Sequence, residues 1–422
     1  MKIFLRTFGC RANHYDSETL RELIGALGHE VVAAPQEADV AVFNSCAVTS
    51  DAEADLRQSV RAVARVNPAV RSVVMGCAAA LDRGAIRSLP TVTDVVSGGD
   101  VTVVSAALAL GTSPVSIATR AQATVRAVLR IQDGCDEHCT FCATTLARGA
   151  SRSRTTRELI DEARELAARH PEIVLTGIHI GSWGMERGES LSVLVQRLIE
   201  AVPDVRFRLS SLEATEVDDA LFSLLRSDHG RLVPYLHAPL QSGSDRVLKR
   251  MGRHWYTADR YAASLRALVE DREVFGLGAD VIAGFPGETE EDHAATLALV
   301  EDLPFTYLHV FPFSSRPGTA ATQLTERVPS GVIGQRASEL RALSARKAAA
   351  YRARRAGGLA DVVVTSGGPR PTGMTEDFLT VCVPAGIARG TCFRACLEAE
   401  DTHLTAIPEH ATSRAARYLS GP

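Results

Sequence analysis

Short apolar runs alternate with amphipathic helical patterns through the middle of the chain. The runs have the length of strands, and the segments between them, such as TRELIDEARELAARH, repeat apolar residues at helical spacing. Six β/α units in a row predict a parallel barrel that is open or partial, because a closed barrel of this kind needs eight, and they place the chemistry at the carboxyl ends of the strands. The expected strands are residues 125–131, 172–176, 205–209, 235–240, 277–283 and 307–312.

The two ends of the chain follow other patterns. Apolar runs at residues 2–8, 38–43 and 71–75 are each followed by a helical pattern, which predicts a parallel α/β domain. A helical stretch at 336–355 leads into short alternating strands with turns such as SGGPRPTG, a pattern typical of a small β-barrel that often binds nucleic acid. Residues 111–124 are rich in small polar side chains and fit a linker. The expected α/β chain therefore comprises a first domain at 1–115, a barrel at 125–335, a linking helix at 336–357 and a β-barrel at 358–410.

Composition narrows the class of protein. With 422 residues, 45% of them hydrophobic and 23% charged, the chain has the make-up of a folded globular protein with several cores. No apolar run approaches the length of a membrane span, and the start MKIFLRTFGC is too polar for a secretory signal, so we expect a cytoplasmic protein without a membrane. A net charge of -4 argues against binding nucleic acid through overall charge and leaves that role to a local basic patch.

Three of the nine cysteines lie within eight residues, directly after the strand-like run AVLRIQDG. Cys135, Cys139 and Cys142 could hold three irons of a 4Fe-4S cluster and leave the fourth iron open for a substrate. The spacing differs from the pairs of zinc sites, and His138 is the one residue nearby that could complete a tetrahedral shell. The spacing favours the cluster over unrelated loop thiols.

A second set of three cysteines is far apart in sequence. Cys10, Cys46 and Cys77 each end a predicted strand, and the carboxyl ends of parallel strands share one edge of a sheet, where ligands collect. Gly9 and Gly76 would permit the sharp turns before two of them. Buried structural thiols are the alternative, and the repeated strand-end position favours a second cluster. We expect structural thiols at the remaining cysteines, Cys382, Cys392 and Cys396.

At these two sets the whole chain resembles a radical S-adenosylmethionine (SAM) methylthiotransferase, with an N-terminal cluster domain, a radical-SAM barrel and a C-terminal TRAM domain. The motifs that carry the resemblance are GCRANHYDSE, NSCAVT, MGCAA, IQDGCDEHCTFC, PLQSGSDRVLKRMGR, DVIAGFPGETEED and FPFSSRPGT. Three subgroups of this family act on threonylcarbamoyladenosine in tRNA, on isopentenyladenosine in tRNA, or on an aspartate of a small-subunit ribosomal protein. GCRAN followed by HYDSE, LTGIHIGSWG and ARGASRSR most resemble the first subgroup, although Arg11 and Ala12 stand where that group usually has Lys and Val.

The resemblance implies two 4Fe-4S clusters, SAM and the methylthiolation of carbon 2 of the modified adenosine next to the anticodon of tRNA. SAM would bind the open iron of the first cluster and yield a radical, because the hydrogen on that carbon is neither acidic nor displaced by a nucleophile. A second SAM would methylate sulfur at the cluster of Cys10, Cys46 and Cys77, so all six cysteines are expected to be catalytic. An electron donor protein and a sulfur source would be further partners. Turn or barrel-rim structure is the alternative role of the expected SAM contacts, which are Gly177, Ser211, Gln241, Ser242 and Gly284.

The charge pattern along the chain is compatible with either an RNA or a protein substrate. Residues 336–355 carry seven basic side chains and one acidic side chain, a net of +6 that could follow a phosphate backbone or could be a solvated helix face. Arg148, Arg152 and Arg154 could hold the substrate near the cluster or pair with carboxylates. Residues 358–409 carry seven acidic and three basic side chains, a net of -4 that would repel phosphate and suits a basic ribosomal protein. A non-catalytic iron-sulfur electron carrier is the alternative from another class.

Overall fold

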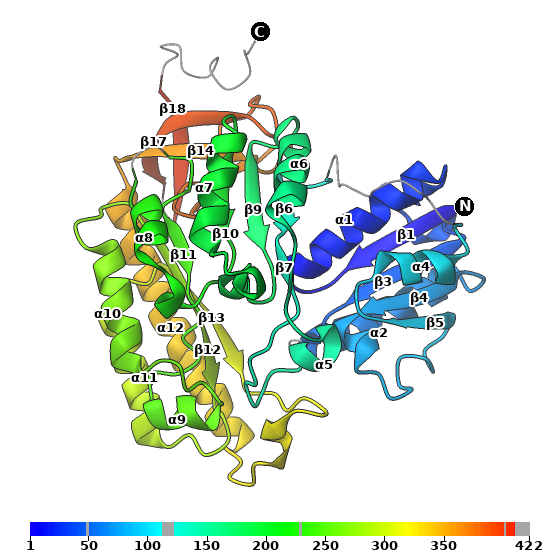
Figure 1. Cartoon of the computed structure of the whole chain (residues 1–422), viewed down its shortest axis with the longest axis horizontal. Helices are drawn as coiled ribbons and strands as arrows, with labels where there is room; N and C mark the ends of the chain where they lie inside the picture. The colour runs from blue at the N-terminus through cyan, green and yellow to red at the C-terminus, as the bar shows by residue number, and fades with distance from the viewer. Residues whose placement is uncertain (48–49, 112–121, 228–229, 401, 410–422) are drawn as a thin grey trace.

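The computed structural model describes residues 1–47, 50–111, 122–227, 230–400 and 402–409. Figure 1 shows an N-terminal α/β region, a central α/β region and a C-terminal β-barrel, which confirms the predicted fold class. Most of the predicted linker at 111–124 lies outside the described residues. Within them, no helix combines the length and the apolar character that crossing a bilayer requires.

The N-terminal region is a five-stranded parallel sheet in the order β2-β1-β3-β4-β5. Its central strands are buried on both faces, since Val40 and Val42 pack into one core and Ala41 and Phe43 into the other. The edge strands β2 and β5 were missed because one is only three residues long and half of the other's residues are polar. The elements are β1 (Lys2–Thr7), α1 (Arg11–Ala26), β2 (Glu30–Val32), β3 (Val40–Ser45), α2 (Ser50–Val66), β4 (Arg71–Gly76), α3 (Cys77–Ala80), β5 (Val92–Ser97) and α4 (Val101–Leu108).

The central region carries its six expected strands in two parallel three-stranded sheets, β10-β9-β6 and β11-β12-β13. Isolated bridges from Phe207 to Leu232 and from Ser211 to His237 join β10 to the second sheet. Its strands are β6 (Arg126–Arg130), β7 (Gln132–Asp133), β8 (Arg152–Ser153), β9 (Glu172–Thr176), β10 (Arg206–Leu209), β11 (Tyr235–His237), β12 (Gly276–Ala283) and β13 (Tyr307–Pro312). Its helices are α5 (Thr144–Arg148), α6 (Thr156–Ala167), α7 (Leu191–Ala201), α8 (Asp219–Leu225), α9 (Asp245–Arg250), α10 (Ala258–Val269) and α11 (Glu290–Asp302).

Within the described residues, β6 and β13 do not pair, so the partial barrel is open between them. A single large core packs the outer faces of these strands against the surrounding helices. The opening faces the N-terminal region, because α1 contacts β6.

A long helix, α12 (Ser330–Arg355), connects the partial barrel to the C-terminal β-barrel. It begins six residues before the predicted stretch and ends where predicted. The β-barrel closes in the order β14-β15-β16-β18-β17 around its own apolar core. Its strands are β14 (Leu359–Val364), β15 (Thr372–Thr375), β16 (Thr380–Cys382), β17 (Cys392–Glu400) and β18 (His403–Pro408).

The β-barrel docks against the amino ends of the central strands through two arginines. Arg206 donates to the carbonyls of Asp361 and Met374 at 2.9 and 3.1 Å, and Arg208 donates to those of Thr375 and Glu376, both at 3.0 Å. Both arginines also pair with the fully buried carboxylate of Glu172. Burial alone would raise the pKa of Glu172, but these guanidinium groups hold it well below its usual range.

Phe378 of the β-barrel completes this contact and leads to a first prediction. Its ring lies 4.7 Å from that of Tyr235 and 5.5 Å from that of Tyr307, measured between centroids. We expect Phe378→Leu to lower the free energy of unfolding by about 1–2 kcal/mol, because an apolar side chain remains but the aromatic pairs are lost. Chemical denaturation would measure this change, with Thr380→Ala, at an exposed site on β16, as the control. Equal stability of the two variants would show that Phe378 does not hold the β-barrel in place.

Candidate iron-sulfur sites

The structure brings Cys10, Cys46 and Cys77 to one edge of the N-terminal sheet. Cys10 follows β1, Cys46 follows β3, and Cys77 begins α3 directly after β4. The side-chain oxygen of Asn13 lies 3.9 Å from the sulfur of Cys10 and also 3.9 Å from that of Cys77. The charges of Cys10 and Cys46 both act on Cys77, as expected for three neighbouring thiols. We call these three residues the N-terminal triad.

Two glycines make this arrangement possible, as the sequence suggested. Gly9 and Gly76 adopt φ angles of 91° and 93°, which favour glycine. A Cβ atom at Gly9 would lie 2.4 Å from the sulfur of Cys46, and one at Gly76 would lie 2.4 Å from the carbonyl oxygen of Ser45. Any side chain at Gly9 would therefore displace a thiol of the N-terminal triad.

Cys135, Cys139 and Cys142 lie in the loop between β7 and α5, and we call them the barrel triad. Each sulfur has a polar neighbour: Nδ1 of His179 at 4.0 Å from Cys135, Nη1 of Arg253 at 3.7 Å from Cys139, and the Thr144 hydroxyl at 3.1 Å from Cys142. The backbone amides of Glu137 and Thr144 also donate to the sulfurs of Cys135 and Cys142, both at 3.4 Å. Such donors stabilise negative charge on sulfur.

Neither triad has the geometry of a site for a single ion. Four-coordinate zinc, with bonds of about 2.3 Å to sulfur, holds its sulfurs about 3.8 Å apart. Among the described residues, the one set of three possible ligands whose donor atoms all lie within 4.8 Å of one another is His237, Asp280 and His309, not a cysteine triad. His138 is exposed and joins no such set. Sulfurs spaced more widely than this suit a cluster in which each thiolate binds a different iron.

Burial makes the thiolate forms of these cysteines depend on nearby positive charge. It raises the pKa of Cys77 to about 11 and that of Cys139 to about 12, while Arg148 and Arg253 act in the opposite direction. A thiol that binds metal must lose its proton, and a bound iron centre supplies the positive charge that makes this favourable.

Arg148 connects the two triads. It ends α5, which follows Cys142, and its charge acts on Cys77 and Cys10 across the domain boundary. Its guanidinium donates to the side chains of Asn13 at 2.7 Å, Asp16 at 2.8 Å and Asp133 at 3.0 Å. Its Nε atom is buried with no hydrogen-bond partner in the described residues, so this donor would fit the sulfides of a cluster on the N-terminal triad.

Two residues that the sequence pattern did not identify, His179 and Arg253, lie beside cysteines of the barrel triad and are themselves held by carboxylates. Nε2 of His179 lies 2.6 Å from a carboxylate oxygen of Glu216. Burial lowers the pKa of His179, but its bonds to Cys135 and Glu216 outweigh burial and raise it to about 10. Arg253 likewise donates to the buried carboxylate of Glu213 at 2.5 Å. His179 and Arg253 fall inside motifs quoted above, but nothing in their spacing identifies them as neighbours of the cysteines.

The expected SAM contacts lie near the carboxyl ends of the central strands, in different settings. Gln241 has a φ of 63°, unusual for a residue other than glycine, and Ser211 is exposed. Ser242 is fully buried, with its hydroxyl 3.3 Å from that of Thr296. Close packing accounts for glycine at the other two positions. A Cβ atom at Gly177 would lie 2.8 Å from the carbonyl oxygen of Gln132, and a Cβ atom at Gly284 would lie 2.4 Å from the side chain of Ile333.

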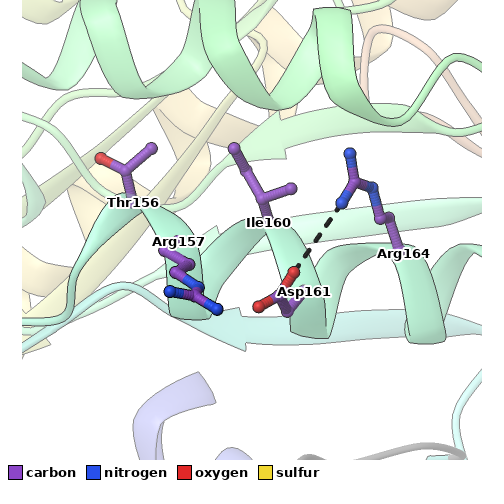
Figure 2. Close-up of a pocket in the computed structure, with 5 residues that line it drawn as sticks. All are labelled: Thr156, Arg157, Ile160, Asp161 and Arg164. Atoms are coloured by element: carbon purple, nitrogen blue, oxygen red, sulfur yellow. Dashed lines mark ion pairs between the residues drawn. The ribbon is translucent and has the colours of Figure 1, made fainter.

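A surface depression on α6 is not part of this site. Figure 2 shows that side chains of this helix line it, with an ion pair between Asp161 and Arg164. Its other lining residues are Thr156, Arg157 and Ile160, so it contains no cysteine.

The basic stretch at 336–355 does not form a continuous surface for phosphate. Arg336 is buried against Glu288, Arg346 pairs with Glu301, and Arg355 is buried against Asp377. The last of these pairs also uses an acidic side chain of the β-barrel, so the net charges of +6 and -4 counted along the sequence overstate what either surface presents to a partner.

Of the three arginines after the barrel triad, two serve the structure. Arg148 is buried as described, and Arg154 pairs with Glu162 at 2.7 Å. Arg152 remains 63% exposed and is the one of the three that is open to a substrate.

Comparisons with known proteins identify the family. Residues 2–98 match the family model described as uncharacterized protein family UPF0004, and residues 129–300 match the radical SAM superfamily. The chain is similar in fold to a radical SAM methyltransferase, TsrM from Kitasatospora setae, with a TM-score of 0.58, 14% identity and coverage of 76% of each chain. The radical SAM match implies a 4Fe-4S cluster and SAM, for which the barrel triad offers the thiolates.

Relatives in sequence cover most of the chain. A threonylcarbamoyladenosine tRNA methylthiotransferase from Bacillus subtilis is 37% identical, over 83% of this chain and 81% of its own length. A second from Aquifex aeolicus is 32% identical, over 82% and 88% respectively. A tRNA-2-methylthio-N6-dimethylallyladenosine synthase from Paracoccus denitrificans is 34% identical over 81% of both chains. The resemblance stated from the motifs is confirmed: the chain belongs to the radical-SAM methylthiotransferase family.

Proposed function

We propose that this chain methylthiolates carbon 2 of N6-threonylcarbamoyladenosine next to the anticodon of tRNA. The observation that carries the proposal is the pair of triads joined by the buried side chain of Arg148. The choice of adenosine is supported by relatives named for this substrate, the first at 37% identity. Relatives named for dimethylallyladenosine follow at about the same identity, so the substrate needs a direct test.

The hydrogen on carbon 2 requires radical chemistry, and the chain would hold the groups that provide it. When bound, a cluster on the barrel triad with SAM supplies the radical, and a cluster on the N-terminal triad supplies the place where sulfur is methylated and transferred. Around these groups, His179 lies beside the sulfur of Cys135, and Arg253 donates a hydrogen bond toward that of Cys139. Arg148 keeps the two triads in a fixed relation by binding side chains of both regions.

Further parts of the proposal concern the cofactor, the partners and the organisation of the chain. We keep Gly177, Ser211, Gln241, Ser242 and Gly284 as proposed SAM contacts, and the strained backbone of Gln241 supports its place among them. We also propose an electron donor protein, a sulfur source and a cytoplasmic location. The domain limits 1–115, 125–335, 336–357 and 358–410 are part of the same proposal.

An aspartate of a ribosomal protein is the alternative target, because the β-barrel is acidic in sequence. Two of the acidic side chains on which this idea depends, Glu376 and Asp377, pair with Arg355 and are thus partly neutralised. The charge argument for a basic protein partner is therefore weaker than the sequence suggested.

Nucleoside analysis of tRNA tests the proposal. In a strain that lacks this protein and has no second enzyme of its kind, the methylthio form of threonylcarbamoyladenosine should disappear, and the unmethylthiolated form should accumulate. The dimethylallyl series and the mass of the ribosomal protein should stay unchanged. Persistence of the methylthio form would contradict the proposal, and a loss of mass from the ribosomal protein would support the alternative.

A further inference from the structure

A polar cluster that contains no cysteine lies on the inner face of the partial barrel. Along β12, Leu277, Ala279 and Val281 belong to the core against the helices, so Asp280 faces inward. Along β13, the rings of Tyr307 and His309 lie 5.2 Å apart on the same inner side. Neither triad uses these side chains, although Tyr307 also contacts Phe378 of the β-barrel.

The cluster is held together by hydrogen bonds. Oδ1 of Asp280 lies 3.0 Å from Nε2 of His237 and 3.1 Å from Nδ1 of His309. The other ring nitrogen of His237 lies 2.8 Å from the Tyr307 hydroxyl, which lies 2.6 Å from that of Tyr235. His237 is thus fixed on both sides. His309 is 55% exposed, and its Nε2 atom makes no hydrogen bond within the described part of the chain.

Arg11 brings a positive charge to the same place from the N-terminal region. It is the first residue of α1 and follows Cys10 of the N-terminal triad. The helix α1 that it begins contacts β6 at the opening of the partial barrel, and the charge of Arg11 acts against the rise that burial causes in the pKa of Tyr307. Arg11 also acts on Arg126 of β6, the strand on the other side of the opening. No described residue forms an ion pair or a hydrogen bond with the Arg11 side chain.

We propose that Arg11 and His309 recognise the substituent on N6 of the substrate base, an inference that rests on the proposed function. A threonylcarbamoyl group carries a carboxylate, a hydroxyl and a urea. Arg11 would bind the carboxylate, and His309, oriented by Asp280, would bond the hydroxyl or the urea. A dimethylallyl group is a hydrocarbon and would leave both side chains without partners, which a polar site penalises.

The position of Arg11 suits this role. Carbon 2 and the N6 substituent both lie on the Watson–Crick edge of adenine, separated by the ring atoms N1 and C6. A base that presents carbon 2 to the N-terminal triad therefore also presents its substituent close to that triad. Arg11 is adjacent to Cys10 in the chain, and the helix that it begins contacts β6 at the opening of the partial barrel.

A divalent cation is the other possible occupant, because His237, Asp280 and His309 have ligand types and spacing that could hold one. The charge of Arg11 nearby opposes a cation. In addition, the three donor atoms already satisfy one another through hydrogen bonds at 3.0 and 3.1 Å. A threonylcarbamoyl substituent would give both Arg11 and His309 a binding partner, whereas a cation would give Arg11 none.

Binding of anticodon stem-loop RNAs to the protein with both clusters reconstituted tests this inference. Three hairpins would carry threonylcarbamoyladenosine, dimethylallyladenosine or adenosine next to the anticodon, and fluorescence anisotropy would give the ratio of their affinities. We expect the native chain to prefer the first by roughly 10- to 100-fold, the range for a charge-assisted hydrogen bond. Arg11→Met should bring the ratio close to one, His309→Phe should lower it by several-fold, and Arg11→Lys should keep part of it.

Arg6→Met is the matched control, because Arg6 is an exposed arginine on the neighbouring strand β1, and its loss should leave the ratio unchanged. If the native chain methylthiolates the threonylcarbamoyl hairpin and Arg11→Met and His309→Phe keep its ratio, this inference is wrong and the proposed function stands. If the native chain does not act on that hairpin, the proposed function fails. Stoichiometric zinc that is lost in His309→Phe, with the ratio unchanged, would overturn the inference in favour of a metal site.

Discussion

Replacing Cys46 with alanine should leave SAM cleavage intact and abolish the insertion of sulfur, whereas Cys139→Ala should abolish both activities. Cys46 belongs to the N-terminal triad and Cys139 to the barrel triad, and each triad lies at the end of its own set of strands. A chain that lacks the N-terminal cluster can still make a radical at the barrel, but it has no place to hold the sulfur. A chain that lacks the barrel cluster makes no radical.

Anaerobic incubation with SAM and a reductant measures the two activities separately. 5'-Deoxyadenosine reports SAM cleavage, and the methylthiolated nucleoside reports sulfur insertion. Iron should fall from roughly eight to roughly four atoms per chain in either variant, since each cluster holds four. Cys382→Ala in the β-barrel is the control and should change neither activity. Equal loss of both activities in Cys46→Ala would contradict separate roles for the triads.

Arg148→Met should destabilise the protein by about 3–5 kcal/mol, the usual effect of removing one partner from a buried ion pair. The Arg148 side chain is 2% exposed and its partner Asp16 is 1% exposed, so the substitution leaves a buried carboxylate short of positive charge. Arg130 also pairs with Asp16 but is partly exposed and reaches it from another direction. It therefore replaces Arg148 only in part.

Arg152→Met provides the comparison, because this neighbouring arginine is 63% exposed and should change stability by no more than about 0.5 kcal/mol. Denaturation in urea under anaerobic conditions measures both variants, and iron analysis shows whether the N-terminal cluster is retained. We expect Arg148→Met to lose iron from that site, since its charge acts on Cys77 and Cys10. Identical unfolding of the two variants would mean that Arg148 does not tie the two regions together.

Strands and cysteines were the features that the sequence could predict, because both depend on local pattern. The runs at 40–45 and 71–76 alternate or concentrate apolar residues, and a cysteine follows each of them directly. Parallel strands end at one edge, so the meeting of the N-terminal triad followed from topology. The edge strand β2 carries too little pattern in three residues to be recognised.

The charged side chains behaved differently, because their roles depend on distant partners. Arg148 could have been a substrate contact or the partner of a helix carboxylate, and the second expectation is right, but its partner Asp16 on α1 lies 132 residues earlier. Arg336 and Arg355 looked like part of a phosphate-binding stripe, and both are buried on carboxylates. No sequence pattern identified His309 as a binding residue, since a single histidine in a strand suggests such a role only when the fold places Asp280 beside it.

The docking of the β-barrel has a consequence for the size of the molecule that this protein can handle. Arg206, Arg208 and Phe378 fix the β-barrel at the amino ends of the central strands, while the barrel triad follows their carboxyl ends. The strand β12 has eight residues and spans roughly 26 Å. A ligand that contacts both the β-barrel and the cysteines must therefore extend along most of the length of these strands, as an RNA arm can and a free nucleoside cannot.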